Sequence, residues 1–126
     1  MKHIVKTPNA PQPIGPYSQA VQFGNLLFVS GQIPVDRDGR TEKNDIRRAT
    51  RLVMENISAI LEAAGMGMQN VVKASIFLQD LSDFAIVNEV YGSYFTDGIP
   101  PARETLQVAR LPKDVPVEIS VIAVKE

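Results

Sequence analysis

Arginine and carboxylate side chains are the groups in this sequence that could carry chemistry. The chain of 126 residues contains no cysteine, which excludes thiolate nucleophiles, disulfides and zinc–thiolate sites. Its only histidine is His3, at the start of the sequence, so no serine has a convincing partner for a nucleophilic triad. A catalytic site would therefore use arginine to recognise an anion and a carboxylate to handle a proton or a water molecule.

Neither a metal nor a nucleotide cofactor is expected. One histidine and the lack of a tight carboxylate cluster leave a transition metal without a convincing ligand set, so we predict no metal site. The glycine patterns GxGxxG and GxxxxGKS/T, which cradle phosphates, are also absent.

The overall charge and the apolar runs narrow the range of partners. The formal net charge is −1, and Arg47, Arg48 and Arg51 form the only basic cluster, which argues against a nucleic-acid partner. No apolar run approaches the ~20 residues that span a bilayer. The stretch Met1 to Gly15 lacks the apolar core of a signal peptide. We therefore expect a cytoplasmic protein with no membrane partner.

The elements that must position these side chains form one α+β domain, as the chain length favours. Two apolar runs between Ser18 and Gln32 flank Gly24-Asn25, which predicts a hairpin. Apolar residues at spacings of three and four predict a helix over Asp45–Ala64, capped by Asn44 or Asp45 and ended by Gly65. The other predicted elements are a strand over Val71–Leu78 and a helix from Ser82-Asp83 to about Phe95, whose inner side carries Phe84, Val87, Tyr91 and Tyr94.

Two last strands, Ala102–Ala109 and Val117–Val124, are predicted to form a hairpin. Alternation places Leu106 and Val108 on the core face, and Arg103, Thr105 and Gln107 on a polar face that they share with Glu118. In this register Arg103 and Glu118 lie roughly 13 Å apart, at opposite ends of one ligand. The polar face could be plain solvated surface, but Ile122 and Val124 beside it suggest that another subunit covers it.

Eight blocks along the chain resemble the RidA (YjgF) family. The resemblance runs in order from about Pro13 to Ala123, and the blocks together are far more specific than any one alone. They are Gly15-Pro16-Tyr17-Ser18-Gln19-Ala20, Val29-Ser30-Gly31-Gln32-Ile33-Pro34, Asn70-Val71-Val72-Lys73, Asp83-Phe84-Ala85-Ile86-Val87-Asn88, Val90-Tyr91, Pro101-Ala102-Arg103, Val108-Ala109-Arg110-Leu111-Pro112 and Val117-Glu118-Ile119.

The resemblance implies a single RidA-like domain over residues 1–126 with a chorismate-mutase-like fold. That fold has about six mostly antiparallel strands with two helices packed on one face, and it assembles as a homotrimer with ligand clefts between subunits. The activity implied is hydrolytic deamination, without a cofactor, of small 2-imino acids and their enamine tautomers. Examples are 2-aminoacrylate, 2-iminopropanoate and 2-iminobutanoate, and the products are 2-oxo acids and ammonia.

The resemblance also implies roles for individual residues. Arg103 matches the arginine that clamps the substrate carboxylate, and Glu118 matches the acid that positions water; otherwise they would be a surface arginine and a rim salt-bridge residue. Cleft-lining positions are matched by Tyr17, Ser30, Gly31 and Asn88, although Asn88 could equally edge the core. Many members have Ser-Cys after Pro-Ala-Arg, whereas Glu104 and Thr105 stand here. We expect Thr105 to contribute to substrate preference.

A second hypothesis from a different class uses the same residues. The chain could be a regulatory protein that binds small carboxylates in the same inter-subunit cleft and turns nothing over. Arg103 predicts binding in both cases, so only Glu118 and product release discriminate between them. A nucleic-acid effector is the least favoured option because the sequence is acidic, with a pI of about 5.8.

Overall fold

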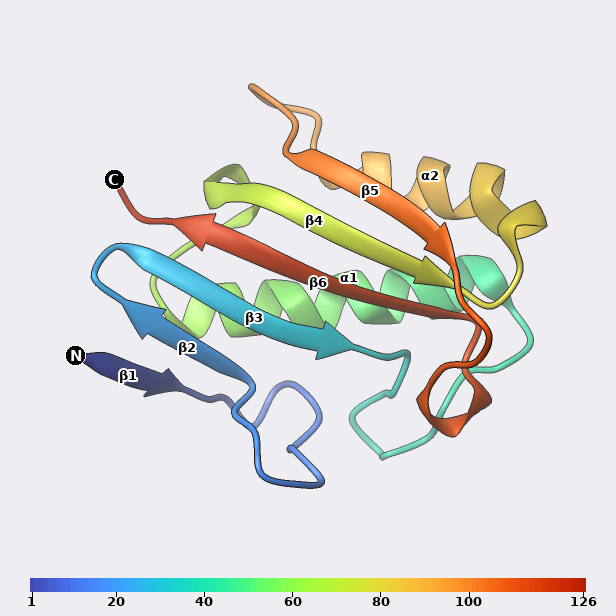
Figure 1. The fold of residues 1–126 in the computed structure, drawn as a ribbon, viewed down its shortest axis with the longest axis horizontal. Coiled ribbons are helices and arrows are strands. Elements are labelled where there is room, and N and C mark those ends of the chain that lie inside the picture. The colour runs from blue at the N-terminus through green and yellow to red at the C-terminus, as the bar shows by residue number, and fades with distance from the viewer.

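Six strands form one sheet in the order β1-β2-β3-β6-β4-β5, with both helices packed on the same side (Figure 1). The computed structural model describes residues 1–126. The strands are β1 (Lys2–Val5), β2 (Ala20–Phe23), β3 (Leu26–Gln32), β4 (Val71–Leu78), β5 (Ala102–Gln107) and β6 (Val117–Val124), and the helices are α1 (Ile46–Ala63) and α2 (Phe84–Gly92). All neighbouring strands are antiparallel except β4 and β5, which are parallel.

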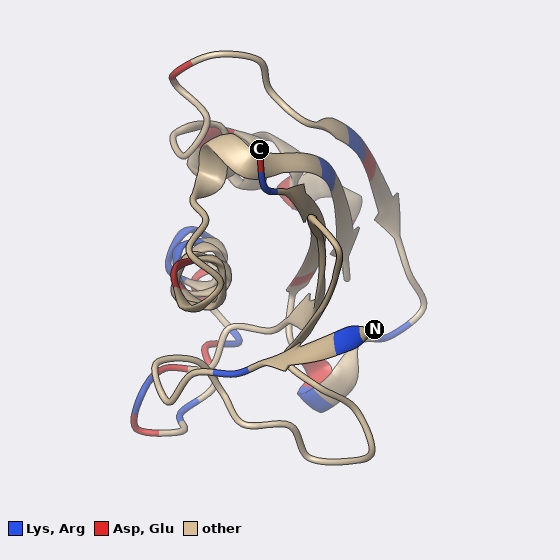
Figure 2. Ribbon diagram, turned by 90° about the vertical axis from the view of Figure 1, so that its left-hand side faces the viewer, with Lys and Arg blue, Asp and Glu red and all other residues tan.

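The core lies between the sheet and α1, on the side where Figure 2 shows the helices. Every second residue of β6 is buried, and Ala74, Ile76 and Leu78 of β4 are completely buried beside them. The apolar stripe of α1 closes over them, with Val53, Ile57 and others at 0% exposure. Burying a side chain of this size contributes roughly 1.5–3 kcal/mol, so this layer dominates the stability of the fold.

The first predicted hairpin, the first predicted helix and the strand over Val71–Leu78 are confirmed. β2 and β3 pair in the expected register around Gly24, which adopts a φ of +61°. Asp45 is the residue that caps α1: its side chain accepts a hydrogen bond from the Arg48 backbone N–H at 3.1 Å. Gly65 follows the helix with a φ of +72°, as expected of a glycine after a helix end. The second predicted helix ends earlier than expected, at Gly92.

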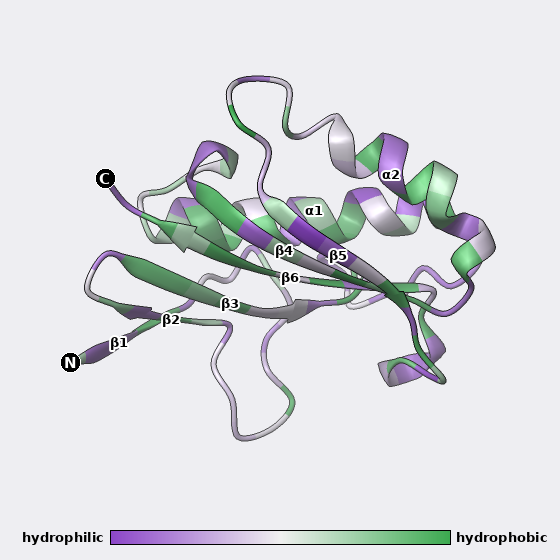
Figure 3. Ribbon diagram, turned by 45° about the horizontal axis from the view of Figure 1, so that its top comes forward, coloured by the Kyte–Doolittle hydropathy of each residue, from purple (hydrophilic) through white to green (hydrophobic).

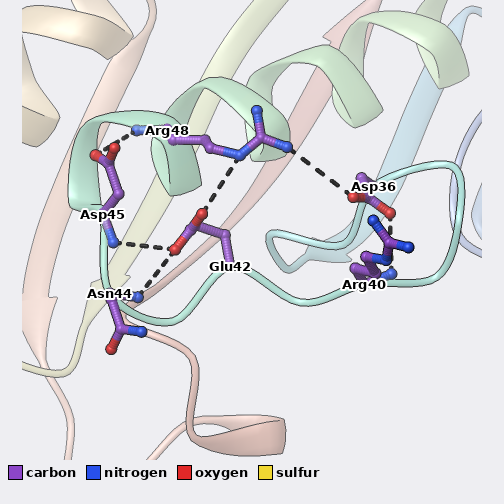
Figure 4. A network of polar contacts seen from close by, with 6 residues as sticks. All are labelled: Asp36, Arg40, Glu42, Asn44, Asp45 and Arg48. Carbon is purple, nitrogen blue, oxygen red and sulfur yellow. Dashed lines mark hydrogen bonds and ion pairs between the residues drawn. The ribbon is translucent and has the colours of Figure 1, made fainter.

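A polar network fixes the loop that leads into α1 (Figure 4). Glu42 accepts hydrogen bonds from the backbone N–H groups of Asn44 and Asp45, each at 3.1 Å. Arg48, on the first turn of the helix, reaches back to Glu42 at 3.3 Å and to Asp36 at 4.0 Å. The loop is thereby tied to the helix start, and Asp36 is held at the rim of a cavity described below.

The predicted hairpin of the last two strands is wrong. β5 and β6 are not neighbours, because β4 lies between them and β5 forms the outer edge of the sheet. The chain leaves β4, passes through α2 and returns parallel to β4 as β5. A parallel pair requires such a helical crossover, and the strand–helix–strand order supplies one. β5 also ends at Gln107, short of the predicted Ala109.

The prediction that Arg103 and Glu118 share a polar face is wrong for the same reason. Arg103 pairs with Ala74, which is buried under the helices, so Arg103 and Thr105 point to the helix side. Glu118 pairs with Phe77 and points to the other face. Leu106, predicted for the core face, lies instead on the open face and is 51% exposed.

The face of the sheet that the helices leave open carries an exposed apolar patch on β3 and β6. Phe28 is 44% exposed there and pairs with Ile122, and Leu26 is 36% exposed and pairs with Val124. Figure 3 shows the hydrophobic colouring of β3 and β6, and a hydrophilic stretch in β5. Neither helix is long and apolar enough to cross a membrane.

Candidate functional site

Arg103 is held in place by one stripe of α2. Its Nη1 donates a hydrogen bond of 2.7 Å to Asn88 Oδ1. Its guanidinium carbon lies 5.5 Å from the ring centroid of Phe84 and 5.2 Å from that of Tyr91. Residues 84, 88 and 91 recur at spacings of four and three, so one helix face presents all three to β5. Arg103 thus combines an amide contact at one edge with aromatic contacts.

The guanidinium of Arg103 has no carboxylate partner in the chain. None of the ion pairs within 4.0 Å includes it, whereas Arg47, Arg48 and Arg110 are all paired. A hollow of about 500 Å³ adjoins it, lined by Leu81, Phe84, Arg103 and Thr105. An arginine presents several donors in a planar fork that matches a carboxylate. The hollow can therefore accept a small carboxylic acid with an apolar side chain against Leu81 and Phe84.

Thr105 and Glu104 have different environments although they are adjacent on β5. Thr105 Oγ1 is buried without a hydrogen-bond partner in the chain, on the side of Arg103. Glu104 points to the open face, where it contacts Lys73 Nζ at 2.8 Å and accepts a hydrogen bond from Ser75 Oγ. These hydrogen bonds, from Lys73 first and Ser75 second, lower the pKa of Glu104, which keeps it ionised. Glu104 therefore ties β5 to β4 on the open face, away from the Arg103 hollow.

A β-bulge places Ser30 and Gly31 next to β6. The pairing of β3 with β6 shifts between Val29 and Gln32, so two residues of β3 stand opposite one residue of β6. Ser30 is fixed by two bonds to the preceding loop: its N–H donates to Gln19 O at 2.9 Å and its Oγ donates to Ser18 O at 2.6 Å. Bulges of this kind re-aim side chains next to functional sites.

Glu118 lies directly against Gly31. A Cβ on Gly31 would collide with the Glu118 carboxylate, so only glycine leaves room for this side chain in its observed position. The Glu118 side chain has no ion pair and no hydrogen bond to another residue, and burial raises its pKa above the ordinary value of 4.5. A carboxylate with a raised pKa exchanges protons closer to neutral pH, which suits a general base.

A cavity of about 330 Å³ adjoins the bulge. Tyr17 and Gly31 line it together with the loops 8–12 and 33–39, and Asp36 and Lys113 are at its wall. Buried Gln19 anchors the first of these loops: its Oε1 accepts from Thr7 N–H at 2.7 Å, and its Nε2 donates to Pro11 O at 2.9 Å. Sequence reasoning missed this cavity, because its lining comes from irregular segments without a periodic pattern.

The predicted site residues therefore fall into two groups within one chain. Arg103, Asn88 and Thr105 lie at the β5 edge on the helix side. Tyr17, Ser30, Gly31 and Glu118 lie around the bulge. Arg103 aligns through Ala74 with Val121, so Glu118 is three residues further along and two strands away. That is about 10 Å along the strands and about 10 Å across them, with the side chains on opposite faces.

The sequence predicts Phe84 and Tyr91 only as residues on the inner side of the second helix, but in the structure both also contact Arg103. Their spacing relative to Asn88 is the signal that the sequence offers. The predicted hairpin conceals it, because that hairpin places Arg103 on the opposite face of the sheet. No cluster of three or more histidine, aspartate or glutamate side chains is gathered as a metal site requires.

Comparison with known proteins gives consistent matches over the whole chain. Residues 7–125 match the family described as Endoribonuclease L-PSP. A RutC family protein of Pyrococcus horikoshii is 54% identical over 127 residues, covering 100% of both chains. The 2-iminobutanoate/2-iminopropanoate deaminase of Salmonella typhimurium is 46% identical, covering 99% of both. The crystal structure of Escherichia coli TdcF with bound serine superposes with a TM-score of 0.94 at 45% identity, covering 98% of this chain and 99% of that one.

Proposed function

This chain belongs to the RidA (YjgF) family, which the family match describes as Endoribonuclease L-PSP, and on that premise we propose that it is a 2-imino acid deaminase. It hydrolyses 2-iminopropanoate, 2-iminobutanoate and enamines such as 2-aminoacrylate to 2-oxo acids and ammonia. The relative from Salmonella typhimurium carries the name of this activity at 46% identity.

The observation that carries the proposal is the unpaired and oriented guanidinium of Arg103. Asn88 holds one edge at 2.7 Å and two aromatic rings lie within 5.5 Å of its centre, while no carboxylate of the chain neutralises it. Such a group binds a substrate carboxylate as a bidentate pair without first breaking an ion pair. The apolar wall of Leu81 and Phe84 then accepts the short aliphatic side chain of the imino acid.

Glu118 acts as the base in the proposed hydrolysis. Its carboxylate takes a proton from water as the water oxygen attacks C2 of the protonated imine, and a tetrahedral amino alcohol forms. Glu118 then returns the proton to the nitrogen, and as the C–N bond breaks the hydroxyl proton passes to the departing nitrogen, so the 2-oxo acid and ammonium are released. The burial that raises the pKa of Glu118 supports this exchange. Imines hydrolyse readily in water, so orientation and charge can supply the acceleration required.

Separation of the two groups within one chain supports assembly as a homotrimer. Arg103 and Glu118 point to opposite faces of one sheet and cannot contact one small molecule from the same chain. The open face exposes Phe28, Leu26 and Leu106, which another copy can cover. In the proposed trimer the Arg103 group of one chain and the Glu118 group of a neighbouring chain form each cleft.

RNA cleavage, which the family description mentions, has less support in this chain. The net charge is −1, and two of the three arginines in the basic cluster are paired with carboxylates, Arg47 with Glu89 and Arg48 with Glu42. Phosphate binding relies on unpaired basic side chains. Arg103, by contrast, is not paired with a carboxylate and is free to bind a small carboxylate ligand.

The test generates the imine in situ with a pyridoxal-phosphate-dependent dehydratase and follows loss of the intermediate. Wild-type protein should accelerate the loss, Arg103→Ala should weaken binding of 2-oxobutanoate about ten- to several-hundredfold, and Arg103→Lys should recover part of it. Glu118→Gln should bind 2-oxobutanoate like the wild type but turn over slowly. Binding without any acceleration by the wild type would instead identify a non-catalytic carboxylate-binding protein.

A further inference from the structure

The aromatic rings of α2 do more than fill the core. Tyr91 is only 5% exposed and packs in the main core cluster, yet its ring centroid also lies 5.2 Å from the guanidinium carbon of Arg103. Phe84, one helical turn before Asn88, contacts the same guanidinium at 5.5 Å. Arg103 itself is exposed on an edge strand, where a long side chain normally samples many rotamers.

Three contacts, one hydrogen bond and two cation–π contacts, restrict this freedom. The Asn88 hydrogen bond fixes Nη1, and each ring attracts the cation through its quadrupole. Because Phe84, Asn88 and Tyr91 all project from α2, they are rigid relative to one another, and Val87 and Val90 anchor that helix in the interior. The guanidinium is thus oriented before any ligand arrives.

We propose that Tyr91 and Phe84 are positioning residues that set the orientation of the Arg103 guanidinium for carboxylate binding. The inference rests on the role of Arg103 in the proposed function, and it assigns to the rings a share of the ligand affinity. They do not touch the ligand carboxylate; they reduce the conformational freedom that Arg103 would otherwise lose on binding.

The ring of Tyr91, and not its hydroxyl group, performs this role. The hydroxyl is buried and has no hydrogen-bond partner in the chain. Burial raises the pKa of Tyr91, with nearby Arg103 opposing the rise, so the side chain stays neutral. A neutral hydroxyl without a partner adds nothing to the orientation of Arg103, and phenylalanine at this position retains the face of the ring.

A double-mutant cycle on the full-length protein tests the proposal, with 2-oxobutanoate as the probe and calorimetry as the measurement. Tyr91→Leu and Phe84→Leu should each weaken binding about 3- to 30-fold, the range of a partly desolvated cation–π contact. Tyr91→Phe should bind within about twofold of the wild type. In the Arg103→Ala background Tyr91→Leu should not weaken binding further, because the group that its ring orients is gone, and Phe84→Leu should retain only the smaller loss that its contact with the ligand side chain supplies.

Tyr94→Leu is the matched control, since Tyr94 follows the same helix but faces Arg51 and Glu55 instead of Arg103. It should leave the affinity unchanged even if it lowers the melting temperature. Should Tyr91→Leu fail to fold, Phe84→Leu carries the test, because that ring is only partly buried.

The proposal is overturned if the leucine variants bind like the wild type, if they weaken binding equally with and without Arg103, or if the wild type does not bind the probe. Coupling between the rings and Arg103 in a protein that hydrolyses no imine would support it while refuting the proposed function. Normal imine hydrolysis without coupling between the rings and Arg103 would refute this positioning role and leave the proposed function intact.

Discussion

Replacing Gly31 with alanine should impair catalysis while sparing the fold. The new Cβ would lie 2.8 Å from Cδ and 3.1 Å from Cγ of Glu118, and closer still to one carboxylate oxygen. Those atoms form the end of a flexible side chain, so Glu118 must move away. The backbone itself accepts alanine, because Gly31 is not among the glycines with a left-handed φ.

The expected changes in stability are small and partly cancel. A side chain pushed about 30° from its rotamer costs roughly 0.5–1.5 kcal/mol. Replacing glycine with alanine at a position that tolerates it stabilises the fold by about 0.4–1 kcal/mol, because alanine lowers the conformational entropy of the unfolded chain. For a chain of this length 1 kcal/mol corresponds to about 4 °C, so the melting temperature should move by less than that. Turnover is more sensitive, since a displacement of ~1 Å can cost about 100-fold.

The assay is imine loss in the dehydratase-coupled reaction, with 2-oxobutanoate binding measured in parallel. Gly31→Ala should lower turnover about 10- to 100-fold and leave binding at Arg103 within about twofold. Gly92→Ala is the control, because a Cβ there meets nothing within 4 Å. In a Glu118→Gln background, Gly31→Ala should change turnover little, because the carboxylate that it displaces is already gone. A stable Gly31→Ala protein with wild-type turnover would show that the position of Glu118 does not limit the reaction.

Three further predictions follow from burial and exposure. Because burial raises the pKa of Glu118 above 4.5, the folded state binds this proton more tightly than the unfolded state, and the ionised carboxylate opposes folding above the raised pKa. Glu118→Gln should therefore raise the melting temperature near neutral pH, and this advantage should shrink as the pH falls through the raised pKa and be absent below 4.5; a difference independent of pH contradicts this. Thr105→Val removes a buried hydroxyl without a partner and should stabilise the fold by up to about 1–3 kcal/mol in urea denaturation, so a loss of stability would reveal an unrecognised bond. Light scattering at micromolar concentration should give about three times the chain mass of 13.8 kDa, and Phe28→Asp on the open face should lower it, whereas a monomeric wild type would remove the proposed clefts.

Local patterns in this sequence identify elements well but do not identify their partners. Val71–Leu78 and the amphipathic stripe of α1 are predictable because periodicity and end signals agree. Alternation in Ala102–Gln107 correctly separates Arg103 from Leu106, but it cannot say which strand lies next to β5. The order strand, helix, strand from β4 to β5 favours a parallel pair, and it outweighs the short connection that suggested a hairpin.

The candidate site is likewise only partly predictable from the sequence. Arg103, Glu118 and the glycine beside Glu118 are recognisable through family motifs, which encode residue types and not their distances. The contact between Gly31 and Glu118 depends on a bulge in β3, and no local signal in the sequence specifies the register shift there. The support that α2 gives Arg103 becomes visible only once β5 is placed beside β4.

The central place of β6 has a consequence for how the chain folds. The last strand of the sheet in sequence order pairs with both β3 and β4, including contacts between Leu26 and Val124. Until β6 pairs with its neighbours, no strand hydrogen bonds join β1, β2 and β3 to the β4–α2–β5 unit. Closing the sheet must therefore await a contact of very long sequence separation, which favours slow folding. Deletion of Val117–Val124 should leave two collapsed halves with exposed strand edges, prone to aggregate.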